Sequence, residues 1–322
     1  MSAGGGGAGE AAVGVQRSER SIRKGAGMAL LLLVLLLVPR FANNYYLEVL
    51  SEAWLYVLLC LGLNIVVGFA GLLDLGYAAF FAVGAYTAGI VTIRLGQSFW
   101  LSLPIAVVTA TLAGVIIGGP TLRLRSDYLA IVTLGFGEMV RITVRNLAIT
   151  GGASGLVGIE RPHLFGYALH SIGAFYYVFL LLAVLGIVAS HRLENSRIGR
   201  AWKYVRSDED AARAMGINHA AVKLAAYALG AIFAAIGGCF YATKMTAISP
   251  ETFTFNQSLL ILLGVVLGGR GKIPGVILGA LVIVIFPELF RDVGSMRMLV
   301  FAVSLLLIML FRPAGIWPER WR

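Results

Sequence analysis

Long apolar runs alternate with short polar segments along most of the chain. A helix that crosses a membrane needs about 20 apolar residues, or fewer where other helices surround it. By this measure we expect about ten spanning helices, within a range of about eight to ten, and therefore an all-α, polytopic membrane helical bundle. The expected spans are 25–46, 53–69, 76–93, 99–118, 128–148, 174–190, 224–243, 255–268, 274–290 and 297–313.

The composition agrees with a membrane protein. Hydrophobic residues make up 59% of the 322 residues and charged residues only 13%, whereas a soluble domain carries about 25% charged residues. The formal net charge of +10 could indicate a nucleic-acid partner. However, 18 of the 26 lysines and arginines fall in segments that the alternation of spans puts on one side of the membrane. Membrane topology therefore accounts for the basicity, and we expect no nucleic-acid partner.

The distribution of basic residues also predicts the orientation. Short loops rich in lysine and arginine stay on the cytoplasmic side of a membrane. The loops expected on the other side hold few basic residues, namely Arg40, Arg94, Arg161, Lys244 and Arg291. We therefore expect a multi-pass transmembrane domain over 25–313, with both termini, the loop 191–223 and the tail 314–322 in the cytoplasm.

The N-terminal region has two interpretations. Residues 1–24 begin as a Gly/Ala-rich stretch and are expected to form a disordered cytoplasmic tail. The basic residues within 17–24 and the apolar run 28–38 are also typical of a secretory signal, with Ala42 in a possible cleavage zone. The other interpretation is a retained first helix that is kinked at Pro39. We expect retention, because the rest of the chain is itself a membrane bundle.

The polar segment 191–223 has the features of folded structure. It carries seven lysines or arginines against four acids. Ser207 can cap a helix, the acids that follow it suit the positive helix end, and Gly216 stands where a helix stops. We expect a two-turn helix over 208–215. Its alanines would let another protein approach the backbone closely, so this helix is a candidate docking element for a soluble partner.

Candidate pathway residues are charges and glycines inside the apolar spans. Ionisable residues at such positions are expensive and mark functional hypotheses. Asp74 lies between Gly71 and Gly76, where a broken helix could expose its charge to a water-filled path. Glu138 and Arg141 are three residues apart on one helical face. For these two, an internal ion pair that fixes helix packing is the alternative to substrate contact.

No catalytic or metal-binding pattern emerges from the sequence. Cys60 and Cys239 both lie within apolar runs, which excludes a disulfide framework. The histidines are scattered without ligand spacing. The sequence GGRGKIPG around Lys272 resembles a phosphate loop but lacks the leading glycine and the Ser or Thr that should follow the lysine. We expect a non-catalytic protein without cofactor or metal.

Several stretches together resemble one known family. They are GLNIVVGFAGLLDLGYAAFFAVGAYTAGI (62–90), DYLAIVTLGFGEMVRITVRN (127–146), TGGASGLVGI (150–159), SRIGRAWKYVRSDEDAARAMGIN (196–218), SPETFTFNQSLLILLGVVLGGRGKIPGVILGA (249–280) and FPELFRDVGSMRMLVFAVSLLLIMLFRPAGIWP (286–318). Over about residues 50–318 the chain resembles the LivM-like permease subunits of bacterial ABC importers for branched-chain amino acids.

The resemblance implies a fold, a location and partners. The chain would be a type II importer-like permease in the bacterial inner membrane, paired with a second permease subunit. Two cytoplasmic ATP-binding subunits would supply ATP hydrolysis, and a periplasmic amino-acid-binding protein would deliver the substrate. In this family a cytoplasmic EAA-x-x-x-G motif contacts the ATPase. Its counterparts here are Asp210, Ala211, Ala212, Met215 and Gly216, with Asp in place of Glu, and the usual downstream I-x-L-P portion is not clear.

Three alternatives stay open at this point. Sibling ABC permeases for urea, short amides or other amino acids share these motifs. A stand-alone secondary transporter would need inverted repeats and paired intramembrane carboxylates, for which Asp74 and Glu138 are sparse candidates. An integral membrane enzyme would need clustered His, Cys or Asp near an interface, and the sequence offers no such cluster.

Overall fold

The computed structural model describes residues 34–121, 126–164, 167–169, 171–291, 296–312 and 315–317. The chain forms two compact units, Met1–Leu47 and Glu48–Arg322. In the first unit a helix covers 34–41, passes through Pro39 and is interrupted at Ala42 and Asn43. The expected first span 25–46 is therefore not one continuous helix. Its beginning and the expected tail 1–24 lie outside the described residues.

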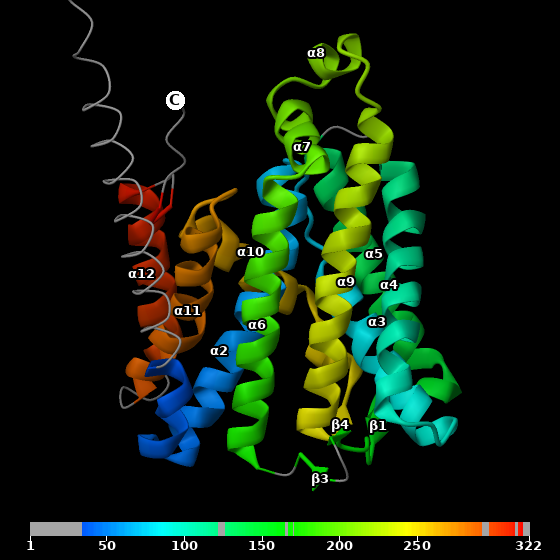
Figure 1. The fold of residues 1–322 in the computed structure, drawn as a ribbon, viewed down its shortest axis with the longest axis vertical. Coiled ribbons are helices and arrows are strands. Elements are labelled where there is room, and N and C mark those ends of the chain that lie inside the picture. Colours follow the sequence, from blue (N-terminus) through cyan, green and yellow to red (C-terminus); the bar gives the residue numbers. More distant parts are fainter. Residues whose placement is uncertain are drawn as a thin grey trace, which may run out of the picture. The chain divides into compact units, whose positions relative to one another are not determined.

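Helices make up most of the described residues, as expected (Figure 1). In chain order they are α2 (Asn44–Leu63), η1 (Asn64–Phe69), α3 (Ala78–Gly89), η2 (Ile90–Arg94), α4 (Phe99–Thr121), α5 (Ser126–Asn146), η3 (Ala148–Thr150), η4 (Gly152–Ser154), α6 (Ile172–Glu194), α7 (Arg197–Ser207), α8 (Glu209–Ala214), α9 (His219–Met245), η5 (Pro250–Phe253), α10 (Phe255–Gly268), α11 (Ile273–Leu289) and α12 (Arg297–Phe311). The expected span 53–69 corresponds to α2 with η1, the span 76–93 corresponds to α3 with η2, and each later span corresponds to one helix. The largest boundary error is the start of α2.

The apolar helices suit a lipid environment. Within the described part of the chain, Asn44–Phe69, Phe99–Gly119, Ile172–Glu194 and His219–Met245 are long and apolar enough to cross a membrane. Shorter apolar helices cover Ala78–Arg94, Phe255–Gly268 and Ile273–Leu289. Large apolar side chains are exposed along α4 and α6, including Leu112, Ile116, Leu181 and Leu185. In water such faces would be an aggregation hazard, whereas lipid solvates them.

Two small strand pairs depart from the all-α expectation. β1 (Leu156–Val157) pairs antiparallel with β4 (Ala247–Ile248), and β2 (His163–Leu164) pairs with β3 (Tyr167–Ala168). The register of the first pair sets Leu156 opposite Ile248. This pair joins the connection after α5 to the connection after α9, so it ties together two parts of the chain that are far apart in sequence.

Glycines bring the central helices into backbone contact. α9 packs against both α3 and α4. A Cβ atom on Gly84 of α3 would overlap the backbone of Ala235, and one on Gly238 of α9 would overlap the backbone of Phe81. Cys239 donates its thiol to the carbonyl oxygen of Gly84 at 3.3 Å. Small residues at such crossings are the usual device of membrane helix packing, because they permit close approach.

We predict that Gly84→Leu prevents stable folding, whereas Gly135→Leu is tolerated. The added side chain at residue 84 must displace the backbone of α9, and overpacking of this kind costs about 1–3 kcal/mol or more. Around Gly135 of α5 nothing lies within 4 Å of an added Cβ atom. Size-exclusion profiles and melting temperatures of the detergent-solubilised variants test this prediction. Equal yields of the two variants would contradict the close crossing of α3 and α9.

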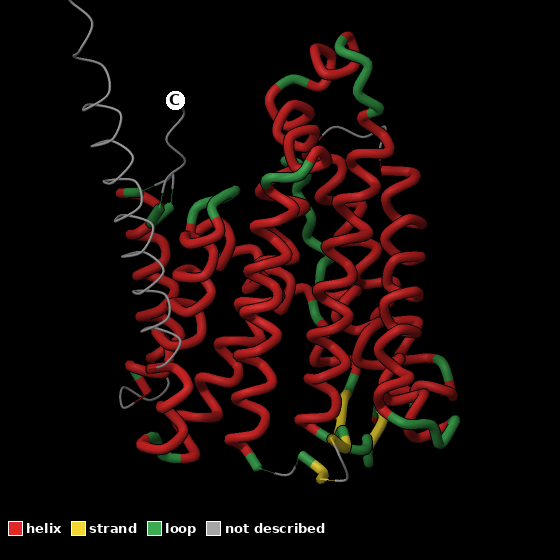
Figure 2. The backbone as a smooth tube through the Cα atoms, in the orientation of Figure 1, coloured by secondary structure: helices red, strands yellow, loops and turns green. Residues whose placement is uncertain are grey.

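An interruption separates the second and third apolar helices. Residues 70–77 run as loop between η1 and α3, among the surrounding helices (Figure 2). Gly71 has a φ of +73°, in the left-handed region that favours glycine. The amide of Ala78 at the start of α3 donates to Ser258 Oγ of α10 at 2.8 Å. Two short helices are thus joined at their N-terminal ends by a side-chain hydrogen bond.

Candidate functional site

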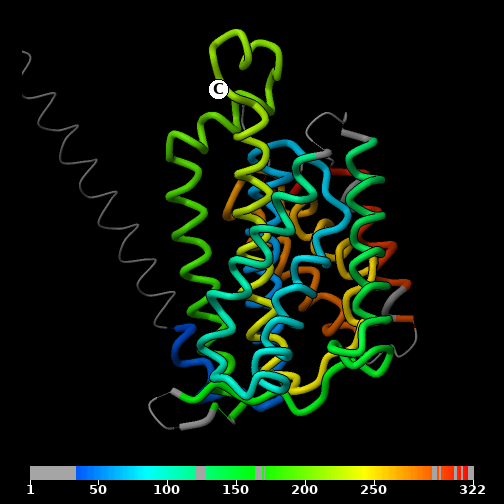
Figure 3. Tube along the Cα trace, turned by 90° about the vertical axis from the view of Figure 1, so that its right-hand side faces the viewer, coloured from blue at the N-terminus to red at the C-terminus, as the bar shows by residue number. Residues whose placement is uncertain are grey.

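The α7–α8 segment (Arg197–Ala214) connects α6 to α9 and projects beyond the neighbouring helices (Figures 1 and 3). Sequence reasoning predicted one helix in this region, and the structure has two. The missed helix, α7, is capped by Ser196, whose Oγ accepts from the amide of Gly199 at 3.1 Å. A capping signal was present at Ser196, but the dense basic residues that follow made the stretch resemble a solvated loop.

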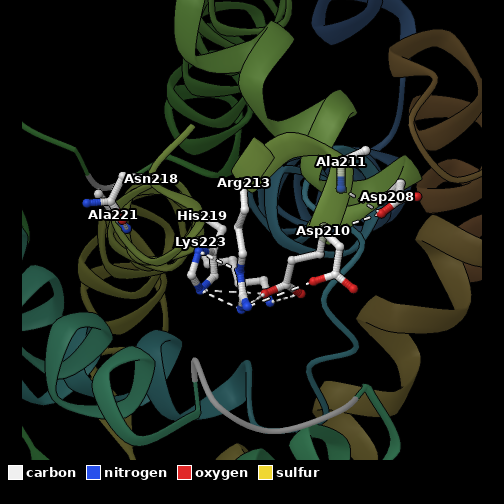
Figure 4. Close-up of polar contacts among 9 residues, drawn as sticks. Asp208, Asp210, Ala211, Arg213, Asn218, His219, Ala221 and Lys223 are labelled. Atoms are coloured by element: carbon white, nitrogen blue, oxygen red, sulfur yellow. Dashed lines mark hydrogen bonds and ion pairs between the residues drawn. The ribbon is translucent and has the colours of Figure 1, made fainter. Parts of the chain in front are cut away.

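The start of α8 differs by one residue from the expectation. Asp208 caps this helix, because its Oδ1 accepts from the amides of Asp210 and Ala211 at 2.9 and 3.0 Å (Figure 4). The predicted cap, Ser207, is instead the last residue of α7. Aspartate caps a helix as well as serine does and adds negative charge at the positive helix end. α8 is therefore shorter than the expected helix over 208–215.

α8 ends at Ala214, one residue before the expected end, and the predicted glycine stop follows at Gly216. Gly216 has a φ of +79°, and its amide donates to the carbonyl oxygen of Arg213 at 2.9 Å. The next amide, that of Ile217, donates to the carbonyl oxygen of Ala212 at 3.0 Å. This left-handed ending satisfies carbonyl groups that the helix leaves free and turns the chain toward α9.

α8 has one exposed face and one buried face. The Asp210 side chain is 94% exposed and Met215 is 70% exposed. Ala211 and Gly216 are exposed as well. Ala212, by contrast, is only 2% exposed, because it packs against its own chain. Of the five predicted docking residues, Ala212 therefore supports the helix from within, and the other four form its accessible surface.

A cluster of ion pairs joins α8 to α9 (Figure 4). Glu209 accepts from Lys223 at 2.7 Å and from Arg213 at 3.0 Å. Arg213 also donates to His219 at 3.2 Å. Burial acts to raise the pKa of Glu209, but the hydrogen bond and charge of Lys223, together with His219 and Arg213, outweigh it and hold that pKa below 4.5. Glu209 is thus the shared anion of the cluster.

We predict that Glu209→Gln loosens α8 at neutral pH, whereas Asp210→Asn does not. Both variants remove one acid from the same helical turn, but only Glu209 holds Lys223. Amide hydrogen exchange of α8 should rise by about two- to fivefold, because a partly exposed pair is worth about 0.5–1 kcal/mol. A lowered pKa stabilises the folded state above the unfolded pKa. In the parent chain the same loosening should therefore appear only below pH 4.5, as Glu209 takes up a proton. Equal exchange in both variants would contradict the role of Glu209.

α7 is anchored by a tryptophan that sequence reasoning did not single out. Trp202 is fully buried, and its Nε1 donates to the carbonyl oxygen of Val222 at 2.7 Å. On the same helix, Lys203 pairs with Glu194 of α6 at 2.9 Å. A large aromatic residue within a basic, polar stretch was the available signal. Both contacts connect α7 to the long helices that precede and follow it.

The predicted pathway residues Gly71, Asp74 and Gly76 lie in the interruption between η1 and α3. Asp74 is 1% exposed, and its Oδ1 accepts from the amide of Gly76 at 2.8 Å. Its other carboxylate oxygen, Oδ2, accepts no hydrogen bond from the described residues. A Cβ atom on Gly76 would overlap the backbone of Thr133 in α5. The expected helix break is confirmed, and in this structure it encloses the carboxyl group.

Glu138 and Arg141 form the ion pair that their spacing predicts. Arg141 Nε donates to Glu138 Oε2 at 2.8 Å. Arg141 also pairs with Glu251 of η5 at 3.2 Å, and Arg145 lies 3.6 Å from the same carboxylate. A partner 110 residues away has no signal in the local sequence. A small cavity lies beside Glu138 and is lined by Leu75, Ala78 and Ser258 among others.

These features define a class of protein. Most of the described helices are apolar, several expose apolar faces, and a non-helical stretch between η1 and α3 surrounds a buried carboxyl group. Among the described residues, no group of three or more His, Cys, Asp and Glu side chains could hold a metal ion. Together the fold and the site are those of a helical integral membrane protein with a structured, projecting polar segment.

The comparison with known families gives the particular family. The chain belongs to the family described as branched-chain amino acid transport system / permease component, which matches residues 45–311. It is 40% identical to the high-affinity branched-chain amino acid transport system permease protein LivM of Escherichia coli, over 89% of this chain and 75% of the relative.

More distant relatives extend the family. The chain is 28% identical to the probable branched-chain amino acid transport permease protein LivM of Methanocaldococcus jannaschii, over 83% of this chain and 91% of the relative. It is 23% identical to the permease protein LivH of Escherichia coli, over 81% of this chain and 90% of the relative. No solved structure gives a significant match.

Proposed function

We propose that the chain is a permease subunit of an ATP-driven importer that moves branched-chain or related hydrophobic amino acids across the bacterial inner membrane. One observation carries the substrate class: the 40% identity to LivM of Escherichia coli over 89% of the chain. In this proposal the apolar helices of the subunit form part of the transport path, and the subunit itself does not hydrolyse ATP. ATP hydrolysis is then the task of partner subunits.

The proposed assembly contains a second permease subunit, two cytoplasmic ATP-binding subunits and a periplasmic amino-acid-binding protein. The similarity to both LivM and LivH of one organism supports a heterodimeric membrane part. In this proposal about ten helices cross the membrane in a type II importer-like arrangement. The charge asymmetry of the loops supports cytoplasmic termini at both ends.

The exposed face of α8 is the proposed docking surface for an ATP-binding subunit. We define this docking surface as Asp210, Ala211, Met215 and Gly216, and Ala212 supports it from below. The small residues Ala211 and Gly216 permit close approach, and the Asp208 cap and Gly216 ending make the helix a rigid unit. ATP binding would bring the ATP-binding subunits together, move α8, and tilt the helices so that access changes sides.

The interruption around Asp74 and the pair Glu138–Arg141 are the proposed pathway or gating elements. Broken helices inside a membrane are tolerated where they are shielded or line a cavity. Gly71 and Gly76 carry no side chains of their own, and they let Arg206 of α7 and the backbone of Thr133 in α5 approach the interruption closely. A zwitterionic substrate with an apolar side chain needs weak contacts that do not trap it, and small residues suit such a path.

Substrate uptake by the assembled importer tests the proposal. The chain is reconstituted in proteoliposomes with its second permease, its ATP-binding subunits and its binding protein. We expect leucine, isoleucine and valine to accumulate only when ATP is on the side of the ATP-binding subunits. Urea and acetamide, as competitors, should have no effect. Accumulation of urea without leucine would favour the sibling-importer alternative.

We predict that reporter fusions after Lys223 and at the C-terminus are both cytoplasmic. The loop 191–223 holds seven basic residues, and such loops resist export. Alkaline phosphatase should be inactive and a fluorescent protein active at both sites. A fusion after Lys244, expected on the periplasmic side, is the matched control and should give the opposite pattern. Phosphatase activity after Lys223 would overturn the proposed topology.

A further inference from the structure

α7 contacts the interrupted helix directly. The guanidinium of Arg206 donates through Nη1 to the carbonyl oxygen of Gly68 in η1. One turn earlier on α7, the ring of Trp202 stacks on Phe69, with centroids 6.3 Å apart and planes at 14°. Gly68 and Phe69 are the last residues of η1, immediately before the interruption 70–77. α7 therefore holds the broken helix at the point where it breaks.

The interruption is shaped to admit this contact. Gly71 has a φ of +73°, and a Cβ atom at that residue would lie 2.8 Å from Cγ of Arg206. The aliphatic part of Arg206 thus occupies the space that a side chain at residue 71 would need. A charge-assisted hydrogen bond is stronger than a neutral one, and the stacked rings add a second point of contact.

α7 and α8 are both fixed to the start of α9 by side-chain contacts. Trp202 donates to the carbonyl oxygen of Val222 at the start of α9. Glu209 of α8 binds Lys223, the next residue of α9, at 2.7 Å. α7, α8 and the first turn of α9 are therefore joined by side-chain contacts in addition to the chain. α8 therefore cannot move relative to α7 and the start of α9 without breaking these contacts.

We infer that Arg206 is a positioning residue that transmits movement of α8 to the interruption at 70–77, and so to the surroundings of Asp74. η1 is a π-helix, and π-helical turns within helices are frequent at functional sites. A helix of this kind can adopt two conformations, and the hydrogen bond of Arg206 to its last turn favours one of them. This inference rests on the proposed docking role of α8.

The test measures whether the interruption responds to nucleotide. A single reporter cysteine replaces the half-buried Leu73, while the native Cys60 and Cys239 are fully buried and give the labelling background. The complete importer is labelled with N-ethylmaleimide, either nucleotide-free or trapped with ATP and vanadate. We expect the labelling rate to differ by about fivefold or more between the two states, a typical size for coupling between two sites.

Arg206→Gln should abolish this nucleotide response and amino-acid uptake while the ATP-binding subunits still co-purify. Arg206→Lys should preserve most of the response, because an ammonium can also donate to the carbonyl oxygen of Gly68. Arg197→Gln is the matched control, since Arg197 is exposed in the first turn of the same helix and should be dispensable. A full nucleotide response in Arg206→Gln would overturn the inference.

Two further variants separate the possible failures. Phe69→Leu keeps an apolar side chain but loses the stack on Trp202, so it should weaken the nucleotide-dependent change in labelling. It replaces Arg206→Gln as the test if that variant inserts poorly. An unchanged response in Phe69→Leu together with a poorly inserted Arg206→Gln counts against the inference. Ala211→Arg tests the docking surface itself. Retained ATP-binding subunits in Ala211→Arg would refute the proposed docking, whatever the Arg206 variants do.

Discussion

Arginine in place of Ala211 is expected to abolish uptake while the chain remains inserted in the membrane. Ala211 is exposed on α8, and only its backbone amide takes part in the Asp208 cap. Arginine is a good helix former, so α8 should persist. The long charged side chain would stand where a partner must approach. An unpaired charge in an interface costs about 2–5 kcal/mol, which weakens docking on the order of 30-fold or more.

The measurement combines uptake with co-purification of the ATP-binding subunits. Ala148→Arg is the matched control, because Ala148 is also an exposed alanine but lies in η3, in the connection between α5 and β1. β1 and α8 lie at opposite ends of the helices in Figure 1. This control should leave uptake and co-purification intact. If Ala211→Arg transports normally with its partners bound, α8 is not the docking element.

Gly216→Pro tests α8 by changing its C-terminal end instead of its exposed surface. Proline fixes φ near −65°, whereas Gly216 has a φ of +79° and donates its amide to Arg213. The ending of α8 would have to change, and the docking surface with it. Ala212→Arg is a poorer probe, because Ala212 is 2% exposed. Arginine there would disturb the packing of α8 on its own chain, and lost transport would then not separate docking from folding.

Much of the helical framework is predictable because one physical requirement dominates it. A backbone in lipid must satisfy its own hydrogen bonds, so long apolar runs form helices whatever their neighbours do. The break between Gly71 and Gly76 was predictable because a charged residue stands there between glycines within an apolar region. The stop of α8 before Gly216 followed from the left-handed geometry that glycine accepts most readily.

The missed features depend on contacts that are remote in sequence. Ser207 and Asp208 are adjacent and are both good capping residues, so local pattern does not decide between them. The burial of Ala212 depends on how α8 lies against the rest of the chain. Arg206 belongs to a basic stretch that resembles a solvated loop, and its contact with Gly68 spans 138 residues. Glu251 likewise lies 110 residues from Arg141.

Leucine uptake is expected to depend on ATP and to survive the loss of the proton gradient. The purified chain alone should hydrolyse no ATP. Its only sequence that resembles a phosphate loop, around Gly271 and Lys272, fails the required pattern. In the structure this turn serves a packing role, because the amide of Gly271 is buried and donates to Asn64 Oδ1 at 2.9 Å. An amide engaged in this way is not available to cradle a phosphate.

The decisive measurement is uptake in intact cells treated with an uncoupler while the ATP level is maintained. Persistent uptake agrees with partner subunits as the energy source. Uptake that collapses with the proton gradient would instead revive the secondary-transporter alternative, in which a carboxyl group carries protons. Asp74 and Glu138 would then be the first residues to replace, as Asp74→Asn and Glu138→Gln. Asp74 is the stronger candidate of the two, because its Oδ2 accepts no hydrogen bond from the described residues, whereas Glu138 is held by Arg141.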